Sequence, residues 1–517
     1  MKLRILSTSD VHGYLYPTNY SSRTNQQGYG FLKIATKIEQ LKNAANPDDW
    51  VICIENGDFI QGSPLTYYTA KQAPRWRSIY TALTNAVGFD AGILGNHEFN
   101  YGMDYLADCE AGRNYPILNA NFKAPAGSDI INAPYRILEK QGVKVGILGL
   151  TTQFISHWES VDHIVGWQFK SAVATAKKWV PLLREKVDVV VVAYHGGFER
   201  DLQTGDPTEP LTGENEGSAL LREVPGIDAL ITGHQHREIA TISLGTPVTQ
   251  PGEKGQTIGE ITIDLSDEHK IIATDAQLIS MADVQPAAKY VRLMTKLNDE
   301  VENWLDQEMG QINGDMRITD PFAARFNGHS YLTFINDVQM AATGATISGT
   351  ALFNDDVLGY GSTVTMRQIL NSYVYPNTLV VARVTGAELR QALERSASFF
   401  SVTPDGKAGI SAAFSKPKVQ YYNYDVYRGI VYEFDLRKPV GNRVTNLLID
   451  GKPLSDEAKV DVALNQYRGM GGGGYDMFGP DKIVKEVQVD MTELIGDYFK
   501  SHPIVEAKQD HNFKIQL

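Results

Sequence analysis

The 517-residue sequence has only two cysteines and no long apolar run. Cys53 and Cys109 allow at most one disulfide and lack metal-ligand spacing, which excludes a disulfide scaffold and a zinc–cysteine site. No apolar run approaches the length of a transmembrane segment. The N-terminal stretch MKLRILSTSDVHG lacks the apolar core of a signal peptide, so we expect a cytoplasmic protein. The alternative is an exported protein whose leader has been removed.

The chain also lacks an excess of basic residues, with a net charge of −13. Binding to a nucleic-acid polymer requires a basic face, so we expect no such partner. A small anionic substrate is compatible with this charge, because bound metal ions would dominate the local field. The length allows about two to four domains, and the sequence patterns carry no signal for an oligomeric state.

The most informative stretch is Gly92–Asn100, GILGNHEFN, in which an apolar run stops at Gly95 and is followed by Asn96, His97 and Glu98. This pattern is typical of a buried strand that delivers polar groups at its carboxyl end. Four other stretches repeat it. They are Leu3–Ser7 before Asp10 and His12, Trp50–Ile54 before Asp58, Val187–Ala193 before His195, and Ile227–Ile231 before His234 and His236.

Helical patterns lie between these strands, at Gly28–Lys42, Arg77–Val87 and Ala172–Glu185. Alternating strands and helices predict βαβ units and a layered α/β architecture. We place this first domain at residues 1–285. Residues 286–316 contain a long amphipathic helix, predicted at Pro286–Gly310, that links it to a second, strand-rich domain at residues 317–517.

The strand-end residues combine carboxylate, imidazole and amide groups that suit two divalent ions, with Mn, Zn, Fe, Co and Mg as candidates. Two ions roughly 3.5–4 Å apart need a shared ligand. Asp58 is the candidate, because each of its two carboxylate oxygens can take one ion. A neutral amide from Asn96 would keep the ions electrophilic enough to turn a bridging water into hydroxide near neutral pH. That hydroxide would attack phosphorus.

Asn96 and His97 are neighbours, and an extended backbone would allow only one of them to face the ions. We assign Asn96 as the ligand and His97 as a catalytic group beside the ions. His97 would either stabilise charge on the transferring phosphoryl group or protonate the leaving alkoxide. Glu98 is interpreted as a structural hydrogen-bond partner, and the remaining histidines, including His163, as surface or packing residues.

The ordered set of strand ends resembles the signature blocks of calcineurin-like metallophosphoesterases over about residues 2–280. The blocks are Asp10-x-His12, Gly57-Asp58, Gly95-Asn96-His97-Glu98, His195 and Gly233-His234-x-His236. The resemblance implies a four-layer α/β/β/α fold with two central sheets. It also implies one ion on Asp10, His12, Asp58 and His236, and another on Asp58, Asn96, His195 and His234.

The second half resembles the smaller, α+β C-terminal domain of the 5′-nucleotidase family. The motifs are Asn377–Leu379, Thr385–Leu389, Tyr424–Ile430 and Gly471–Tyr475. In that family two aromatic rings of this domain sandwich the base, and motif position implies Tyr424 and Tyr467 for these rings. The same resemblance implies substrate contacts at Gly472 and Gly473. Stacking of a ring on a base is worth roughly 1–3 kcal/mol and tolerates any base.

Three departures from typical 5′-nucleotidases resemble the sister branch of 2′,3′-cyclic-nucleotide 2′-phosphodiesterase/3′-nucleotidases. Asn100 stands where an Asp orients the catalytic histidine, Gly473 where an Asp holds the ribose hydroxyls, and Ser348–Asn354 where a GGGIR block is usual. An Asp at the ribose edge would repel a phosphate carried on the 2′ and 3′ oxygens.

We therefore expect a metal-dependent phosphohydrolase whose substrates are small nucleotides, with 2′,3′-cyclic nucleotides and 3′-nucleotides favoured. His97 and Asn100 are its predicted catalytic residues. One alternative is a 5′-nucleotidase or nucleotide-sugar hydrolase on the same scaffold. Another is a nucleotide-binding or surface protein with an idle metal centre.

Overall fold

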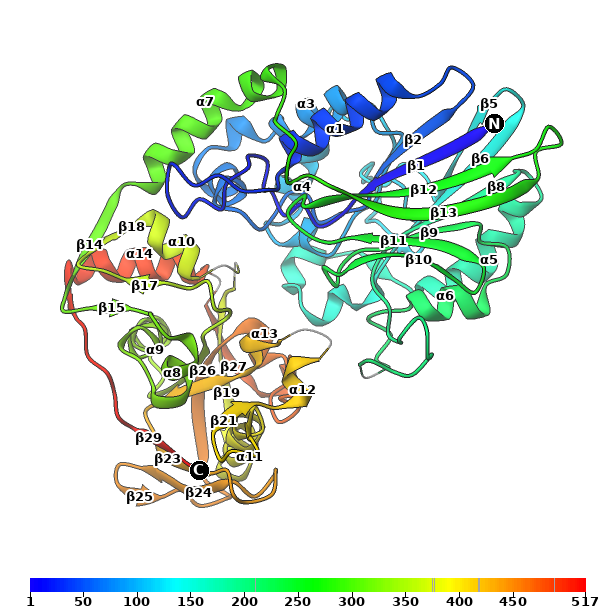
Figure 1. The fold of residues 1–517 in the computed structure, drawn as a ribbon. Coiled ribbons are helices and arrows are strands. Elements are labelled where there is room, and N and C mark those ends of the chain that lie inside the picture. Colours follow the sequence, from blue (N-terminus) through cyan, green and yellow to red (C-terminus); the bar gives the residue numbers. More distant parts are fainter. Residues whose placement is uncertain (210, 374, 376, 417–418, 488) are drawn as a thin grey trace. The chain divides into compact units, whose positions relative to one another are not determined.

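The structure is a computed structural model that describes residues 1–209, 211–373, 375, 377–416, 419–487 and 489–517 (Figure 1). The chain forms two compact units, Met1–Glu302 and Asn303–Leu517. Each unit has its own hydrophobic core. Within the described ranges, every helix is too short or too polar to cross a membrane.

Two sheets form the centre of the first unit, with strand orders β13-β12-β1-β2-β3 and β10-β11-β9-β8-β6-β5. The first contains β1 (Lys2–Thr8), β2 (Trp50–Glu55), β3 (Ala91–Gly92), β12 (Thr257–Leu265) and β13 (Ile271–Ser280). The second contains β5 (Tyr135–Lys140), β6 (Val143–Thr151), β8 (Val189–His195), β9 (Ala229–Ile231), β10 (Glu238–Ser243) and β11 (Thr246–Pro251). A separate ribbon pairs β4 (Phe122–Lys123) with β7 (Gln168–Phe169).

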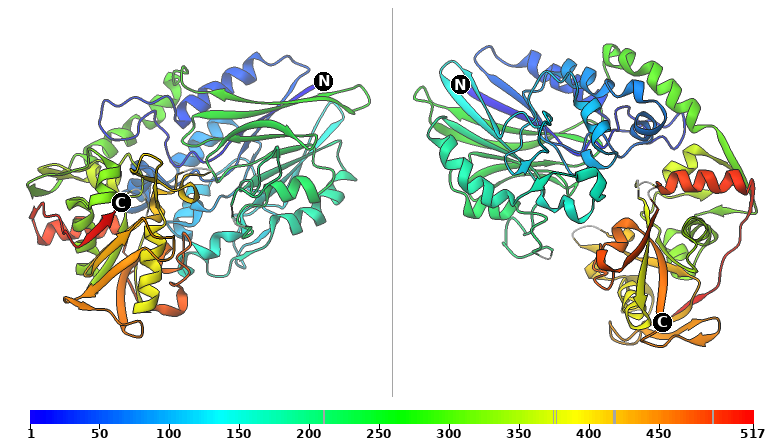
Figure 2. Two further views of the ribbon diagram at one scale, coloured as in Figure 1. Left: turned by 60° about the horizontal axis from the view of Figure 1, so that its bottom comes forward. Right: turned by 180° about the vertical axis from the view of Figure 1, so that it is seen from behind.

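Helices cover the outer faces of the two sheets, which makes the four layers that the sequence predicts (Figures 1 and 2). Apolar residues of α5 and α6 pack on the second sheet, and α1 and α3 lie over the first. Between the sheets, Leu3, Ile5 and Ile52 pack with Val145 and Val189. The helices are α1 (Phe31–Ala44), α2 (Pro64–Tyr67), α3 (Ile79–Val87), α4 (Met103–Glu110), α5 (Ala172–Arg184), α6 (Gly217–Glu223) and α7 (Ala288–Leu305).

Parallel pairing determines where the chemical groups of the first unit gather. β1, β2 and β3 run parallel, and so do β6, β8 and β9. Their carboxyl ends therefore lie at one edge of each sheet, where ligand sites are expected in α/β folds. β8 is fully buried because both of its faces are covered, and it is apolar up to its polar last residue, His195.

The second unit is an α+β domain around a sheet of order β22-β16-β26-β19-β27. Its strands are β14 (Glu308–Asn313), β15 (Met316–Arg317), β16 (Ile347–Ala351), β17 (Gly359–Tyr360), β18 (Thr363–Thr365), β19 (Leu379–Thr385), β20 (Phe400–Val402), β21 (Ala408–Ile410), β22 (Asp425–Arg428), β23 (Val431–Asp435), β24 (Val444–Ile449), β25 (Lys452–Pro453), β26 (Lys459–Asn465), β27 (Ile483–Val487), β28 (Ile504–Glu506) and β29 (Phe513–Gln516). Its helices are α8 (Pro321–Asn327), α9 (Ser330–Thr343), α10 (Met366–Ser372), α11 (Gly386–Ala397), α12 (Ala412–Ser415), α13 (Gln466–Gly469) and α14 (Met491–Ser501).

The predicted amphipathic helix is α7, and it ends at Leu305 rather than near Gly310. The segment Glu308–Asn313 is instead the strand β14, because it pairs with β18 and β28. The division between the two compact units falls inside this helix, between Glu302 and Asn303.

Candidate dinuclear metal centre

The loops that follow β1, β2, β3, β8 and β9 bring the predicted metal ligands together. Potential ligand atoms form two groups, each with all atoms within 4.8 Å of one another. One group is Asp10, His12 and His236, and the other is Asp58, His195 and His234. Asn96 joins the second group, since its Oδ1 lies 2.8 Å from His234 Nδ1.

Two buried atoms of the cluster have no hydrogen-bond partner among the described residues. They are Asp58 Oδ2 and His195 Nε2, which lie 3.1 Å apart. In the other group the Nε2 atoms of His12 and His236 approach to 3.0 Å. A cation beside Asp58 Oδ2 and His195 Nε2 would give both atoms a ligand bond. The carboxylate, imidazole and amide donors therefore fit two divalent cations.

Asp58 lies between the two groups, but only one of its oxygens faces both. Oδ1 accepts the main-chain N–H of His97 at 2.8 Å. Oδ2 lies 3.1 Å from His195 Nε2 and 3.9 Å from His12 Nε2. Oδ2 is therefore the oxygen best placed to be shared by two ions, whereas Oδ1 accepts a main-chain N–H.

The two carboxylates of the cluster favour the charged form of His195. Burial favours its neutral form, but the carboxylates of Asp58 and Asp10 outweigh burial and raise the pKa of His195 to about 10. In contrast, burial and the neighbouring His236 lower the pKa of His12 to about 4. Because an imidazole binds a metal ion only in its neutral form, ion binding expels the proton of His195, and affinity should rise with pH.

The backbone of the cluster is more strained than an extended chain. Asp10 and His12 both have positive φ, at 55° and 51°. Asp58, His234 and His236 are also in the left-handed region, which costs a non-glycine residue roughly 1–3 kcal/mol. Hydrogen bonds from the main-chain N–H groups of Asp10 and His12 to Gly57 and Asp58 hold these turns.

Asn96 and His97 both reach the site, because the backbone turns before them. The predicted strand ends at Gly92, and residues His97–Phe99 form a 3₁₀ turn. The backbone is therefore not extended here, and the choice that an extended backbone would force between the two residues does not arise. The His97 ring lies edge-on to the His12 ring, with centroids 5.2 Å apart.

Glu98 builds this turn. Its carboxylate accepts the main-chain N–H groups of Asp58 at 2.8 Å, Phe59 at 2.6 Å and Gly95 at 2.6 Å. Its predicted role as a structural hydrogen-bond partner is confirmed. One side chain thus fixes the loop that carries Asp58 to the loop that carries His97.

Three further residues extend the His97 side of the site. Asn100 Oδ1 lies 2.6 Å from His97 Nδ1, as expected from the sequence. Asn100 Nδ2 in turn donates to Glu159 at 2.6 Å, and Glu159 also lies 2.8 Å from His163 Nδ1. Glu159 carries no signal in the sequence, and His163 was expected to be an ordinary surface or packing residue, since neither lies in a motif with a recognisable spacing.

Each ligand histidine has an oxygen partner on its other ring nitrogen. His12 Nδ1 lies 3.1 Å from Gln61 O, and His195 Nδ1 lies 2.6 Å from Asn56 O. Carboxylates serve the two histidines of the Gly-His-x-His block. Glu214 lies 3.1 Å from His234 Nε2 and Glu253 lies 3.2 Å from His236 Nδ1. Such partners set ring orientation and ligand basicity.

We expect Glu253→Gln to weaken binding of the ion held by the His236 group roughly 10- to 100-fold, and Glu214→Gln to do the same for the His234 group. Calorimetric titration of the metal-free protein with manganese would measure the two sites. Glu199→Gln is the control, because this buried carboxylate serves the N–H of Ser218 instead. Unchanged affinities in both variants would contradict the orienting role.

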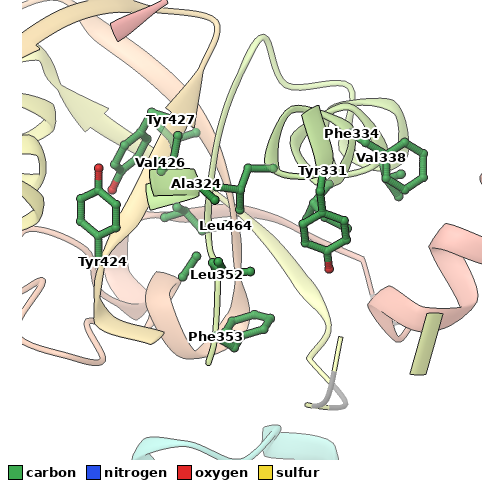
Figure 3. Packing of buried hydrophobic residues seen from close by; sticks show 14 of the residues in the cluster. Ala324, Tyr331, Phe334, Val338, Leu352, Phe353, Tyr424, Val426, Tyr427 and Leu464 are labelled. Carbon is green, nitrogen blue, oxygen red and sulfur yellow. The ribbon is translucent and has the colours of Figure 1, made fainter. Parts of the chain in front are cut away.

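In the second unit, the predicted stacking role of Tyr424 is wrong for this structure. Its ring is fully buried, stacks on Phe399 with centroids 4.9 Å apart, and packs edge-on against Phe400. Its hydroxyl donates to the carbonyl of Arg325 at 3.0 Å. Figure 3 shows it within the packed core. A base could not reach this ring without unpacking the core.

Tyr467, Gly472 and Gly473 do lie together. Tyr467 is half-buried, and a Cβ added at Gly472 would come within 2.6 Å of its ring. Gly473 has φ +75°, and a side chain there would overlap Asn423 Oδ1 and Arg468. The missing Asp at position 473 therefore has a steric reason in addition to the electrostatic one inferred from the sequence.

Comparison with known proteins agrees with the two-unit fold and with the clustered metal-type ligands. Residues 3–238 match the model of the calcineurin-like phosphoesterase family, and residues 308–480 match that of the 5′-nucleotidase C-terminal domain. The chain is 37% identical to a provisionally assigned 5′-nucleotidase from Staphylococcus aureus, whose crystal structure superposes with a TM-score of 0.93. Coverage is 100% of both chains.

Two curated relatives are each 28% identical over 99% of this chain. One is the trifunctional nucleotide phosphoesterase protein YfkN of Bacillus subtilis, of whose length the chain spans 39%. The other is a 2′,3′-cyclic-nucleotide 2′-phosphodiesterase/3′-nucleotidase of Haemophilus influenzae, which is covered over 86%.

Proposed function

Because the chain belongs to the calcineurin-like phosphoesterases that carry a 5′-nucleotidase C-terminal domain, we propose that it hydrolyses phosphoesters of small nucleotides at the candidate metal centre. We further propose that 2′,3′-cyclic nucleotides and 3′-nucleotides are its main substrates. The observation that carries the proposal is the pair of ligand groups that share Asp58 Oδ2.

The residues divide between holding cations and handling the substrate. Asp10, His12, Asp58 and His236 would hold one cation, and Asp58, Asn96, His195 and His234 the other. When bound, two such cations polarise phosphoryl oxygens and supply hydroxide near neutral pH.

His97 handles the phosphate rather than a cation. Its Nδ1 is engaged by Asn100, which leaves Nε2 to contact the phosphoryl group or the leaving oxygen.

For the base we propose Tyr467 together with Tyr422 in place of the buried Tyr424. Both rings are half-buried. Arg468 links their segments, because it donates to the carbonyls of Tyr422 and Gly472, the first at 2.9 Å. Arg468 is itself fixed by Asp425, with Nε and Oδ2 2.6 Å apart.

Tyr467→Ala is expected to raise KM for a nucleotide roughly 5- to 150-fold with little change in kcat, since stacking is worth about 1–3 kcal/mol. The same variant should hydrolyse bis(p-nitrophenyl) phosphate like the wild type, because this ester has no base. Tyr424→Phe keeps the buried ring and serves as the control. A raised KM in the control alone would exclude the Tyr467 site.

A substrate panel tests the proposed function directly. The manganese-loaded protein would be offered 2′,3′-cyclic AMP, 3′-AMP, 5′-AMP and a nucleotide sugar, and the products would be separated by chromatography and measured before and after chelation. We expect the first two to give the highest kcat/KM and chelation to abolish turnover. Preference for 5′-AMP or the sugar nucleotide would support the 5′-nucleotidase alternative. Binding without turnover would support the idle centre.

A further inference from the structure

The Asn100–Glu159 pair controls which nitrogen of His97 carries a proton. A carboxylate only accepts hydrogen bonds. The atom of Asn100 that lies 2.6 Å from Glu159 Oε2 must therefore be its NH₂ group, which leaves the carbonyl Oδ1 facing His97 Nδ1. That carbonyl in turn requires a proton on Nδ1, so Nε2 is the ring nitrogen that can take up a proton and give it off.

The Glu159 side chain is itself held in one orientation. It is 7% exposed, and its Oε1 accepts the main-chain N–H of Ser160 at 2.9 Å and lies 2.8 Å from His163 Nδ1. Only Oε2 is left for Asn100. The hydrogen bonds that run from Ser160 through Glu159 and Asn100 to His97 therefore allow only one assignment of donors and acceptors.

We propose that Glu159 is the positioning residue of the catalytic histidine, and that it acts through Asn100 by fixing the direction of the amide. This inference rests on the proposed phosphoesterase activity. A neutral amide at position 100 could face His97 with either end. The buried carboxylate one step further out selects the carbonyl end, which an Asp at position 100 would provide directly.

The geometry makes a specific prediction for Glu159→Gln. Ser160 would hold the carbonyl of the new side chain, so the new NH₂ group would face Asn100. The Asn100 amide would then turn its carbonyl outward and present NH₂ to His97 Nδ1. This reverses the proton pattern of the ring without changing the volume of any side chain.

Exchanging the carboxylate and the amide between positions 100 and 159 should restore the activity that Glu159→Gln loses. In Asn100→Asp combined with Glu159→Gln, the carboxylate at position 100 accepts from His97 Nδ1 and from the new amide at position 159. Asn100→Asp alone would place two carboxylates, at positions 100 and 159, side by side, and these would repel each other. The paired variant thus keeps every hydrogen bond of the wild type with the two groups exchanged.

The experiment measures kcat and KM for 3′-AMP in the wild type, both single variants and the paired variant, each with its metal content determined. We expect Glu159→Gln to lower kcat roughly 10- to 100-fold, with KM and metal content unchanged. The paired variant should recover most of that loss. Glu216→Gln, at a carboxylate that serves Ser171 and Ala172, should behave like the wild type.

Nitrogen-15 NMR of histidine-labelled protein gives a readout that needs no substrate. His97 should carry its proton on Nδ1 in the wild type and the paired variant, and lose that pattern in Glu159→Gln. An unchanged kcat and an unchanged His97 signal in Glu159→Gln would overturn the inference, and so would a paired variant no faster than the slower single variant. If the wild type hydrolyses no nucleotide, the proposed function fails, while the NMR comparison still decides the role of Glu159.

Discussion

Asp58→Asn is expected to lower turnover on 3′-AMP roughly 10²- to 10⁴-fold. Metal ions contribute several kcal/mol of transition-state stabilisation in such reactions, and each 1.36 kcal/mol lost from it is about tenfold in rate. Asp58 is fully buried, and its Oδ2 is the oxygen that faces both ligand groups. An amide at this position cannot supply the negative charge that two cations share.

Metal analysis of the same variant provides a second readout. We expect Asp58→Asn to bind at most one ion per chain when the wild type binds two. Asp58 is also the main group that raises the pKa of His195, so the variant should release less proton from His195 when metal is added. Asp90→Asn is the matched control, because Asp90 accepts the N–H of Cys53 from the same sheet. Wild-type turnover and two bound ions in Asp58→Asn would remove Asp58 from the shared position.

The general arrangement of the site could be predicted, because each buried strand and the polar residue that follows it can be recognised from a short stretch of sequence. Apolar runs such as Val189–His195 are buried strands, and parallel strands expose their carboxyl ends together. A glycine or polar residue directly after each run marks the point where the chain leaves the sheet. The residues at these points, from Asp10 to His236, converge as expected.

The local geometry could not be predicted, because it depends on contacts between segments distant in sequence. The turn at His97 exists because Glu98 binds the main chain around Asp58. Glu159, Glu214 and Glu253 lie in loops, where neither periodicity nor spacing marks a carboxylate that will face a histidine. Their roles follow only from distances in the folded chain.

Tyr424 shows that motif position does not predict where a side chain points. Motif position gives its place along the chain, but the direction of its ring depends on the aromatic cluster of Phe399, Phe400 and Phe414. A fully buried tyrosine ring gains more from this packing than from an exposed position. Resemblance therefore named a ring that points into the core.

His97→Ala is expected to lower kcat on 3′-AMP roughly 10²- to 10⁴-fold, the range typical of a lost general acid or charge-stabilising group. Metal content should stay at the wild-type level, since His97 belongs to neither ligand group. His157→Ala is the control, because its ring stacks on Phe154 in an exposed position. An unchanged kcat in His97→Ala would remove this residue from the mechanism.

The leaving group separates the two roles open to His97. A p-nitrophenolate departs without a proton, whereas the ribose alkoxide of a nucleotide needs one. If His97 protonates the leaving oxygen, the loss in His97→Ala should nearly vanish with bis(p-nitrophenyl) phosphate. If it stabilises charge on the phosphoryl group, the loss should be similar for both esters. The hydrogen bond from Nδ1 to Asn100 leaves Nε2 as the reacting atom in either case, so the comparison tests the chemistry of one nitrogen.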